Sequence, residues 1–348
     1  IQHPTPLRDV NFDAGIGLIL RGLVKKVVLA DNLAPLVAQA FARPGQLGPL
    51  SAWVAVLAFA AQIYGDFSGY TDMGRGSALL LGYSVPQNFA SPYQSANTAE
   101  FWHRWHMSLS TWLRDYLYIP LGGSRSRPVR VYLNLMITMA LGGLWHGASW
   151  HFLVWGVYEG GLLAFHRLWQ SSVGRAALYR RVIALPPVAF LCRPVTLIFV
   201  CAGWVFFRAD TLGGAFAMLR SMVAFDRAPE AGLALDPGST PVLLLLLAGA
   251  IVVSGWLWAV ARPYAATLAT RAAAATQQPC ARGTEVPAHA ARFARIPATY
   301  TWARAQLDAA WLRSAYVLGL RPVAFVAAVA LLVIWPPHAV QRFIYFQF

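Results

Sequence analysis

Charge is scarce in this sequence. Only 12% of its 348 residues are Asp, Glu, Lys or Arg, whereas soluble globular chains carry about 25%. Apolar residues take their place, because 57% of the chain is hydrophobic and the mean hydropathy is +0.49. This composition excludes a disordered chain, a coiled coil and an ordinary soluble enzyme. It predicts a protein whose outer surface faces lipid.

Cysteine and acidic residues are also few. The three cysteines, Cys192, Cys201 and Cys280, form no CxxC pair and no zinc-like spacing with histidine, which argues against a disulfide framework and a zinc site. The chain has 28 basic residues and 14 acidic ones. Only two of the basic residues, Lys25 and Lys26, are lysines, and the others are arginines. Between apolar segments this excess indicates cytoplasmic loops and anionic lipid headgroups, and not nucleic acid, because no basic stripe interleaved with aromatics lies on a polar segment.

The chain has no recognisable signal peptide. It begins with the polar stretch IQHPTPLRDVNFDAG, and not with a basic leader followed by an apolar core and a small-residue cleavage site. We therefore expect an N-terminal portion to precede this start in the full protein.

Seven apolar stretches are candidates for entering a bilayer, where a helical span needs about 20 apolar residues. Residues 15–34 are interrupted by charges, which favours a tilted or interfacial helix. Residues 50–64 predict a helix that ends at Gly65 and Asp66, and the Gly- and Ser-rich continuation to Tyr83 predicts a broken or re-entrant segment. The five remaining candidates are residues 132–149, 150–168, 188–207, 242–260 and 323–335.

These stretches predict an all-α fold, a polytopic membrane helical bundle with re-entrant or interfacial helices. We expect residues 1–348 to form a single polytopic domain that lacks its first spans. Residues 262–321 are rich in arginine and alanine and contain few long apolar runs. We interpret them as an amphipathic or loosely ordered cytoplasmic connector within that domain.

The densest cluster of polar and aromatic residues predicts a helix over residues 98–118, capped by Asn97 or Thr98. Three of its residues fall on one side at i, i+3 and i+6: Glu100, His103 and His106. A glutamate and two histidines can bind Zn²⁺ or Fe²⁺, although no further ligand has a fixed spacing. The alternative is a hydrogen-bonded interfacial helix beside its tryptophans, which we favour for His103.

His146 lies deep in an apolar stretch, residues 134–156. An ionisable group in such a position is costly unless it is neutral or partnered, so it is a functional candidate. A neutral imidazole is also what a general base requires. Nearby glycines leave room for a backbone or a substrate. His151, five residues on, would point away along a continuous helix, and we interpret it as structural.

Five strings together resemble the membrane-bound O-acyltransferase (MBOAT) family: IYGDFSGYTDMGRG, FWHRWHMSLSTWLRDYLYIPLGG, GGLWHGASWHFLVWG, VFFRAD and FIYFQF. Within that family they are most similar to the bacterial alginate O-acetyltransferase-like branch. The resemblance runs from about residue 15 to the C-terminus and is weakest over 262–321. It implies a helical fold around a central tunnel, in a bacterial inner membrane that the chain crosses several times.

The resemblance also implies the roles of several residues. His146, in the LWHG string, corresponds to the active-site histidine, and His106, in the RWH string, to a second polar site. Many relatives carry a histidine where this chain has Glu159, which puts a third histidine's role in doubt. Substrate contacts are expected from Trp105, Trp145, Asn134, Arg114, Asp115 and Tyr116. We expect neither a metal nor a permanently bound cofactor.

The function predicted from these features is transfer of an acetyl group from a cytoplasmic thioester, acetyl-CoA, towards an exported polysaccharide such as alginate. Transfer is direct or passes through a periplasmic acetyltransferase or another polysaccharide-modification protein. His146 would act as general base, and His106 would bind the acceptor or the developing oxyanion. Arg125, Arg127 and Arg130 are expected to attract the donor's phosphates.

Three alternatives remain open from the sequence. The same fold could transfer D-alanine to teichoic acid or an acyl group to a lipid. A membrane transporter could instead use the two histidines as a proton relay. A structural membrane subunit would need neither histidine for activity.

Overall fold

The computed structural model describes residues 10–225 and 244–257 apart from 254, together with residues 6, 241, 330 and 331. The described part is helical and contains no strand, which confirms the predicted all-α fold. Of the predicted span 242–260, residues 244–253 and 255–257 are helical. The predicted connector 262–321 lies outside the described residues, as does all of the predicted span 323–335 except its residues 330 and 331.

The described chain begins with a nearly continuous helical stretch made of α1 (Phe12–Leu23), the π-helix η2 (Val24–Ala30) and α2 (Asp31–Ala42). The side chain of Asn11 caps α1 by accepting a hydrogen bond from the backbone N–H of Ala14. The helix is therefore longer at both ends than the predicted 15–34. Its interrupting charges, which suggested a membrane interface, all form ion pairs with carboxylates of α2 or α3.

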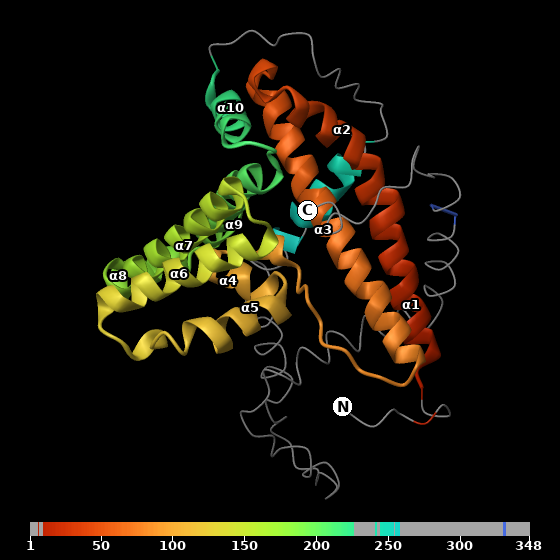
Figure 1. Ribbon diagram of the computed structural model, residues 1–348, viewed down its shortest axis with the longest axis horizontal. Helices are drawn as coiled ribbons and strands as arrows, with labels where there is room; N and C mark the ends of the chain where they lie inside the picture. The colour runs from red at the N-terminus through yellow and green to blue at the C-terminus, as the bar shows by residue number, and fades with distance from the viewer. Residues whose placement is uncertain are drawn as a thin grey trace, which may run out of the picture. The chain divides into compact units, whose positions relative to one another are not determined.

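The long helix α3 (Pro49–Leu80) is unbroken and runs beside α1, as Figure 1 shows. The predicted break at Gly65 and Asp66 is therefore wrong. The reason is that the glycines of α3 serve helix packing. A Cβ added to Gly69 would lie 2.7 Å from the carbonyl oxygen of Gly22, and one added to Gly22 would lie 2.5 Å from that of Gly69. Small residues here let two backbones approach closely.

The predicted single helix over residues 98–118 is also wrong. After η4 (Pro92–Gln94), the chain forms α4 (Thr98–Arg104), α5 (Met107–Leu113) and the π-helix η5 (Arg114–Tyr118), with a sharp elbow at Trp105 and His106. Asn97 is the cap, as predicted, and accepts a hydrogen bond of 2.8 Å from the backbone N–H of Glu100. Because the helix ends before His106, the expected common face of Glu100, His103 and His106 does not exist.

Two of the predicted apolar stretches form a helical hairpin. After η6 (Gly123–Arg125), α6 (Pro128–His146) and α7 (Trp150–Ser171) pack side by side (Figure 1) and meet at the predicted WHGASWH turn. A Cβ on Gly143 would collide with the carbonyl oxygen of Phe152, and one on Gly156 with that of Met139. The short helices η7 (Val173–Arg175) and α8 (Ala177–Ile183) follow.

The helix α9 (Pro186–Arg208) confirms the predicted stretch 188–207, and α10 (Leu212–Val223) follows it. Within the described residues, α3 and α9 are the two helices that are long and apolar enough to cross a membrane. Their buried faces meet α4 and α7 in an aromatic core. Trp204 of α9 stacks there on Trp155 of α7 and packs 4.8 Å, between ring centroids, from Trp105.

Candidate active site

His106 occupies the elbow between α4 and α5. Its φ of +40° lies in the left-handed region that non-glycine residues rarely adopt. Asn88 holds the elbow, because its carbonyl oxygen accepts from the N–H of Met107 at 3.0 Å and its side-chain oxygen accepts from the N–H of Ser108 at 3.1 Å. Such a conformation costs about 1–3 kcal/mol and persists only where the surroundings impose it. The fold therefore fixes the position of this imidazole.

The imidazole of His106 is buried, with 9% of the residue exposed, and the ring of Phe67 packs edge-on against it at 4.7 Å between centroids. Burial lowers the pKa of His106 from its ordinary 6.5 to about 4. The ring is therefore neutral at pH 7. A neutral imidazole donates one hydrogen bond and accepts another, which suits it to bind either a hydroxyl or an oxyanion.

His146 is the last residue of α6 and precedes the turn at Gly147. Aromatic rings surround its half-buried imidazole: Trp155 lies 5.2 Å away and Phe207 5.1 Å away, both roughly perpendicular, and Phe152 lies at 6.2 Å. These walls come from α7 and α9 and keep water from much of the ring. Such a setting favours the neutral form that a general base needs.

Trp145 joins the two histidines. Its ring centroid lies 4.9 Å from that of His146 and 6.3 Å from that of His106. Two imidazoles from separate elements therefore lie close to one indole ring. The structure brings together three of the residues that the sequence predicts for the site: His106, His146 and Trp145.

Two further predicted substrate contacts lie elsewhere. Trp105 is 2% exposed and belongs to the aromatic core, with the ring of Phe89 at 5.0 Å. Asn134 stands 12 residues before His146 on α6, about 18 Å along the helix axis. It is fully buried and donates to the carbonyl oxygen of Gly123 at 3.4 Å, where it supports the loop before α6.

The remaining predicted residues are exposed and are not part of the site formed by His106 and His146. Arg114 and Asp115 of η5 bind each other at 2.7 Å, and Tyr116 packs on Trp112. The three arginines expected to attract the donor stand in or near the loop before α6: Arg125, Arg127 and Arg130. The last of them precedes His146 by 16 residues of one helix, or about 24 Å.

A metal site at Glu100 finds no geometry to support it. Glu100 accepts hydrogen bonds from the side chain of Arg104 at 2.7 Å and from the backbone N–H of Ala96 at 2.8 Å. Across the part of the chain that the structure describes, no three His, Cys, Asp or Glu side chains stand close enough together to hold an ion.

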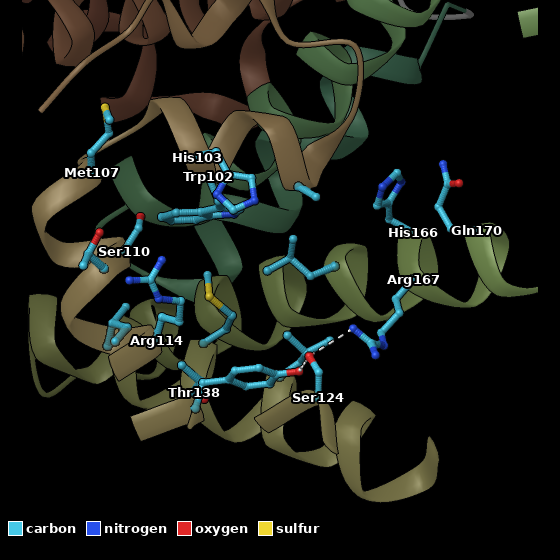
Figure 2. A pocket seen from close by; sticks show the side chains of 17 residues that line it. Trp102, His103, Met107, Ser110, Arg114, Ser124, Thr138, His166, Arg167 and Gln170 are labelled. Atoms are coloured by element: carbon cyan, nitrogen blue, oxygen red, sulfur yellow. Dashed lines mark hydrogen bonds between the residues drawn. The ribbon is translucent and has the colours of Figure 1, made fainter. Parts of the chain in front are cut away.

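A cavity of about 630 Å³ opens beside this site, between α4, α5, α6 and α7. Figure 2 shows His103, Arg114 and Arg167 around it, with Trp102, Met107 and Thr138. Its lining contains two arginines and two histidines and no carboxylate. Its volume is in the range of small-molecule sites. Neither His106 nor His146 lines the cavity, but Met107 directly follows the first of them.

Sequence reasoning missed the ion pairs that join α1 and η2 to α3. Lys26 lies between Asp31 and Asp66, with N–O distances of 2.8 Å and 2.6 Å. Six residues further along α3, or about 9 Å, Asp72 is held by Arg21 and Lys25, which are described further below. The available signal was the presence of two aspartates in GDFSGYTDMGRG, since a buried carboxylate needs a cation.

Glu159, where the sequence departs from the family pattern, is buried between α4, α7 and α9. It is 2% exposed and accepts a hydrogen bond of 3.2 Å from the indole N–H of Trp102. The ring of Trp102 in turn packs 5.9 Å from that of Trp155, which contacts His146. Glu159 is therefore connected through Trp102 to Trp155, which forms part of the wall of the histidine site.

Comparison with known proteins places this geometry in context. The pattern of the membrane-bound O-acyltransferase family (MBOAT) matches residues 2–205, more than half of the chain. The chain is 44% identical over 228 residues to the probable alginate O-acetylase AlgI of Azotobacter vinelandii, covering 64% of this chain and 42% of that protein. It is 39% identical over 216 residues to the peptidoglycan O-acetyltransferase of Helicobacter pylori, covering 62% and 40%.

A more distant relative is the teichoic acid D-alanyltransferase of Streptococcus thermophilus. It is 30% identical over 188 residues, which cover 51% of this chain and 45% of that protein. The chain thus spans about two fifths of the length of the curated relatives that it matches.

Proposed function

Because the chain belongs to the membrane-bound O-acyltransferase family, we propose that it carries the transfer site of an O-acetyltransferase. The observation behind this proposal is the placement of His106 and His146 close to the same ring, that of Trp145. Both imidazoles are shielded from water by aromatic rings, and both come from positions that the fold holds firmly. A neutral general base next to a neutral hydrogen-bonding group is the arrangement that acyl transfer to a hydroxyl requires.

The proposed step is attack of an acceptor hydroxyl on a thioester. His146 removes the hydroxyl proton as the oxygen forms a bond with the carbonyl carbon. The carbon–sulfur bond then breaks, and the imidazolium of His146 returns the proton to the departing sulfur. The products are an O-acetyl ester and a free thiol. The N–H of His106 binds the oxyanion that develops on the carbonyl oxygen in the transition state.

The donor in this proposal is acetyl-CoA, which reaches the site from the cytoplasm. The basic loop with Arg125, Arg127 and Arg130 attracts its phosphates at long range. The cavity beside His106 is lined mainly by apolar side chains, with Arg114 and Arg167 among them, which suits a ligand with an apolar arm and an anionic end. The acceptor is an exported polysaccharide such as alginate, or a periplasmic acetyltransferase that carries the acetyl group onward.

The proposed location is the bacterial inner membrane, which the protein crosses several times with lipid around it. Two described helices have the length and apolar composition of spans. The relatives whose names specify acetylation are acetylases of alginate and of peptidoglycan, both exported polymers. These likenesses support an acceptor on the far side of the membrane from the donor.

The test is to follow radiolabelled acetyl-CoA with the full-length protein in proteoliposomes. We expect His146→Ala to lower the transfer rate by about 10²–10⁴-fold, which is the usual contribution of a general base. His151→Gln is the matched control, because its ring packs on Phe152 and it takes no part in the proposed step. Near-normal labelling of the acceptor by His146→Ala would remove this histidine from the mechanism.

The same assay separates the alternative functions. A transporter would move a solute without covalent transfer of label. A D-alanyltransferase, as in the Streptococcus relative, would label its acceptor from a D-alanyl donor and not from acetyl-CoA. A structural subunit would lose nothing when either histidine is replaced.

A further inference from the structure

Three cations converge on one carboxylate where α1 and η2 pack against α3. The guanidinium of Arg21 donates to both carboxylate oxygens of Asp72 at 2.9 Å. Lys25 Nζ lies 2.7 Å from Asp72 Oδ2, and Arg75 Nη1 lies 3.7 Å from Asp72 Oδ1. A single bidentate guanidinium already pairs a carboxylate well. The other two cations therefore exceed what the neutralisation of Asp72 requires.

These groups line a small polar cavity of about 110 Å³. Asp72 is the one acidic residue in the lining, so three cations against one carboxylate leave a surplus of two positive charges. Apart from Phe89, the rest of the lining consists of hydroxyl and amide side chains: Tyr64, Thr71, Gln87, Asn88 and Ser91. The side chains of Lys25 and Arg75 are only 22% and 23% exposed. The side chain of Arg21 is 56% exposed, so salt and water screen the charges of Lys25 and Arg75 less than that of Arg21.

The neighbouring ion-pair network shows that this surplus is not a general feature of the helix pair. Around Lys26 the balance is reversed, because one cation stands between the two carboxylates of Asp31 and Asp66. The side chain of Lys26 is 7% exposed, and Lys26 lines neither of the two cavities described above. At Asp72 the cations instead border an open volume, which is too small for a whole cofactor and suits a single oxyanion group.

The cavity is close to the proposed transfer site. Asn88, which lines the cavity, is also the residue that binds the N–H groups of Met107 and Ser108 and so holds the elbow at His106. Phe89 lines it too, and its ring packs 5.0 Å from that of Phe67, which contacts the imidazole of His106. Asn88 therefore links the cavity, with its excess of positive charge, to the elbow at His106.

We propose that this cavity binds a phosphate group of a phosphorylated ligand. The tetrahedral oxyanion receives charge-assisted hydrogen bonds from Arg21, Lys25 and Arg75. Two sources present this chemistry: a phosphate of the thioester donor and the headgroup of an anionic lipid. The identification of the phosphate as part of the thioester donor rests on the proposed acetyl transfer. The binding of a phosphate group itself does not.

The test measures binding by calorimetry, with the full-length protein in phosphatidylcholine nanodiscs and inorganic pyrophosphate or coenzyme A as probe. Arg75→Gln is the informative variant, because Asp72 keeps both of its closer partners. We expect this variant to weaken binding about tenfold, as loss of one charge-assisted contact does. Arg75→Lys keeps the charge and should restore most of the affinity. Arg180→Gln, on the exposed face of α8, should leave the affinity unchanged.

Nanodiscs that contain phosphatidylglycerol distinguish the two sources. If a lipid headgroup is the ligand, phosphatidylglycerol competes with pyrophosphate and raises the melting temperature of the wild type more than that of Arg75→Gln. If the donor is the ligand, coenzyme A binding depends on Arg75 and phosphatidylglycerol does not compete. The proposal is overturned if none of the three probes shows an effect that depends on Arg75, or if Arg180→Gln weakens binding equally.

The variant His146→Ala keeps this test independent of the proposed function. It should lose transfer and retain the wild-type affinity for pyrophosphate. Full transfer by His146→Ala would refute the mechanism and leave the anion site standing, whereas an absence of Arg75-dependent binding would refute only the anion site.

Discussion

At the scale of the residue, the neutral state of His106 makes a prediction about pH. Because burial lowers the pKa of His106 to about 4, the imidazole gains a proton only when the pH falls below about 5. Protonation of His106 should therefore leave the transfer rate unchanged between pH 8 and pH 6. The measurement is the initial rate across this range for the wild type and for His106→Asn, since asparagine tolerates the left-handed backbone of the elbow.

We expect His106→Asn to be slower by up to about 10²-fold at every pH, which is the usual cost of losing one oxyanion donor, because the shorter asparagine side chain holds its N–H groups away from the position of the imidazole N–H. A wild-type inflection near pH 6.5 that disappears in this variant would show that His106 titrates as an exposed histidine and would contradict the buried geometry.

The sequence allowed some of these residues to be found and concealed others. His146 was recognisable because an ionisable group in an apolar stretch is costly, and the family motifs singled out His106 and Trp145. Asn134 lies in the same apolar stretch, yet it is three helical turns from His146. Proximity in sequence along a helix does not bring side chains to one point. The approach of Arg21 and Lys25 to Asp72 could not be foreseen, because these two residues precede Asp72 by about 50 positions in the sequence.

At the scale of the element, the close approach of α1 and α3 predicts unequal effects for two glycines of one helix. Gly22→Ala should lower the free energy of unfolding by about 1–3 kcal/mol, because the new Cβ would lie 2.5 Å from the carbonyl oxygen of Gly69. Gly17→Ala is the matched control, since a Cβ there meets nothing within 4 Å. Thermal unfolding in detergent measures both; equal melting temperatures for the two variants would contradict the packing.

The same contact explains which helices the sequence could reveal. Continuous apolar runs identified α6, α7 and α9 almost to their ends, because such runs carry their own signal. The glycines of α3 suggested a break because their packing partner, α1, lies about 50 residues earlier in the chain. The elbow at His106 was missed for the opposite reason, since no glycine or proline marks it.

At the scale of the whole molecule, the hairpin of α6 and α7 predicts on which side of the membrane the basic loops lie. The guanidinium of Arg167, near the end of α7, lies 3.4 Å from the hydroxyl of Ser124, just before α6. The chain therefore returns to the end at which it started. The arginine-rich loops on either side of the hairpin share that end, and the positive-inside rule assigns it to the cytoplasm.

Impermeant maleimide labelling of single-cysteine variants tests this arrangement, with the native cysteines first replaced by serine. Ser126→Cys and Ser172→Cys, on the two loops, should react only with reagent added to the cytoplasmic side. Ala148→Cys, at the turn, lies beyond the far end of α6, about 27 Å along the helix from Pro128. Neither α6 nor α7 is among the described helices that are apolar enough to cross a membrane by themselves. The length of α6 is nevertheless close to the roughly 30 Å thickness of the hydrocarbon core, so Ala148→Cys should resist cytoplasmic reagent. If Ser126→Cys and Ser172→Cys were labelled from opposite sides of the membrane, the two ends of the hairpin would lie on different sides. The arginine-rich loops would then not share the cytoplasmic side, which contradicts the proposed approach of the donor.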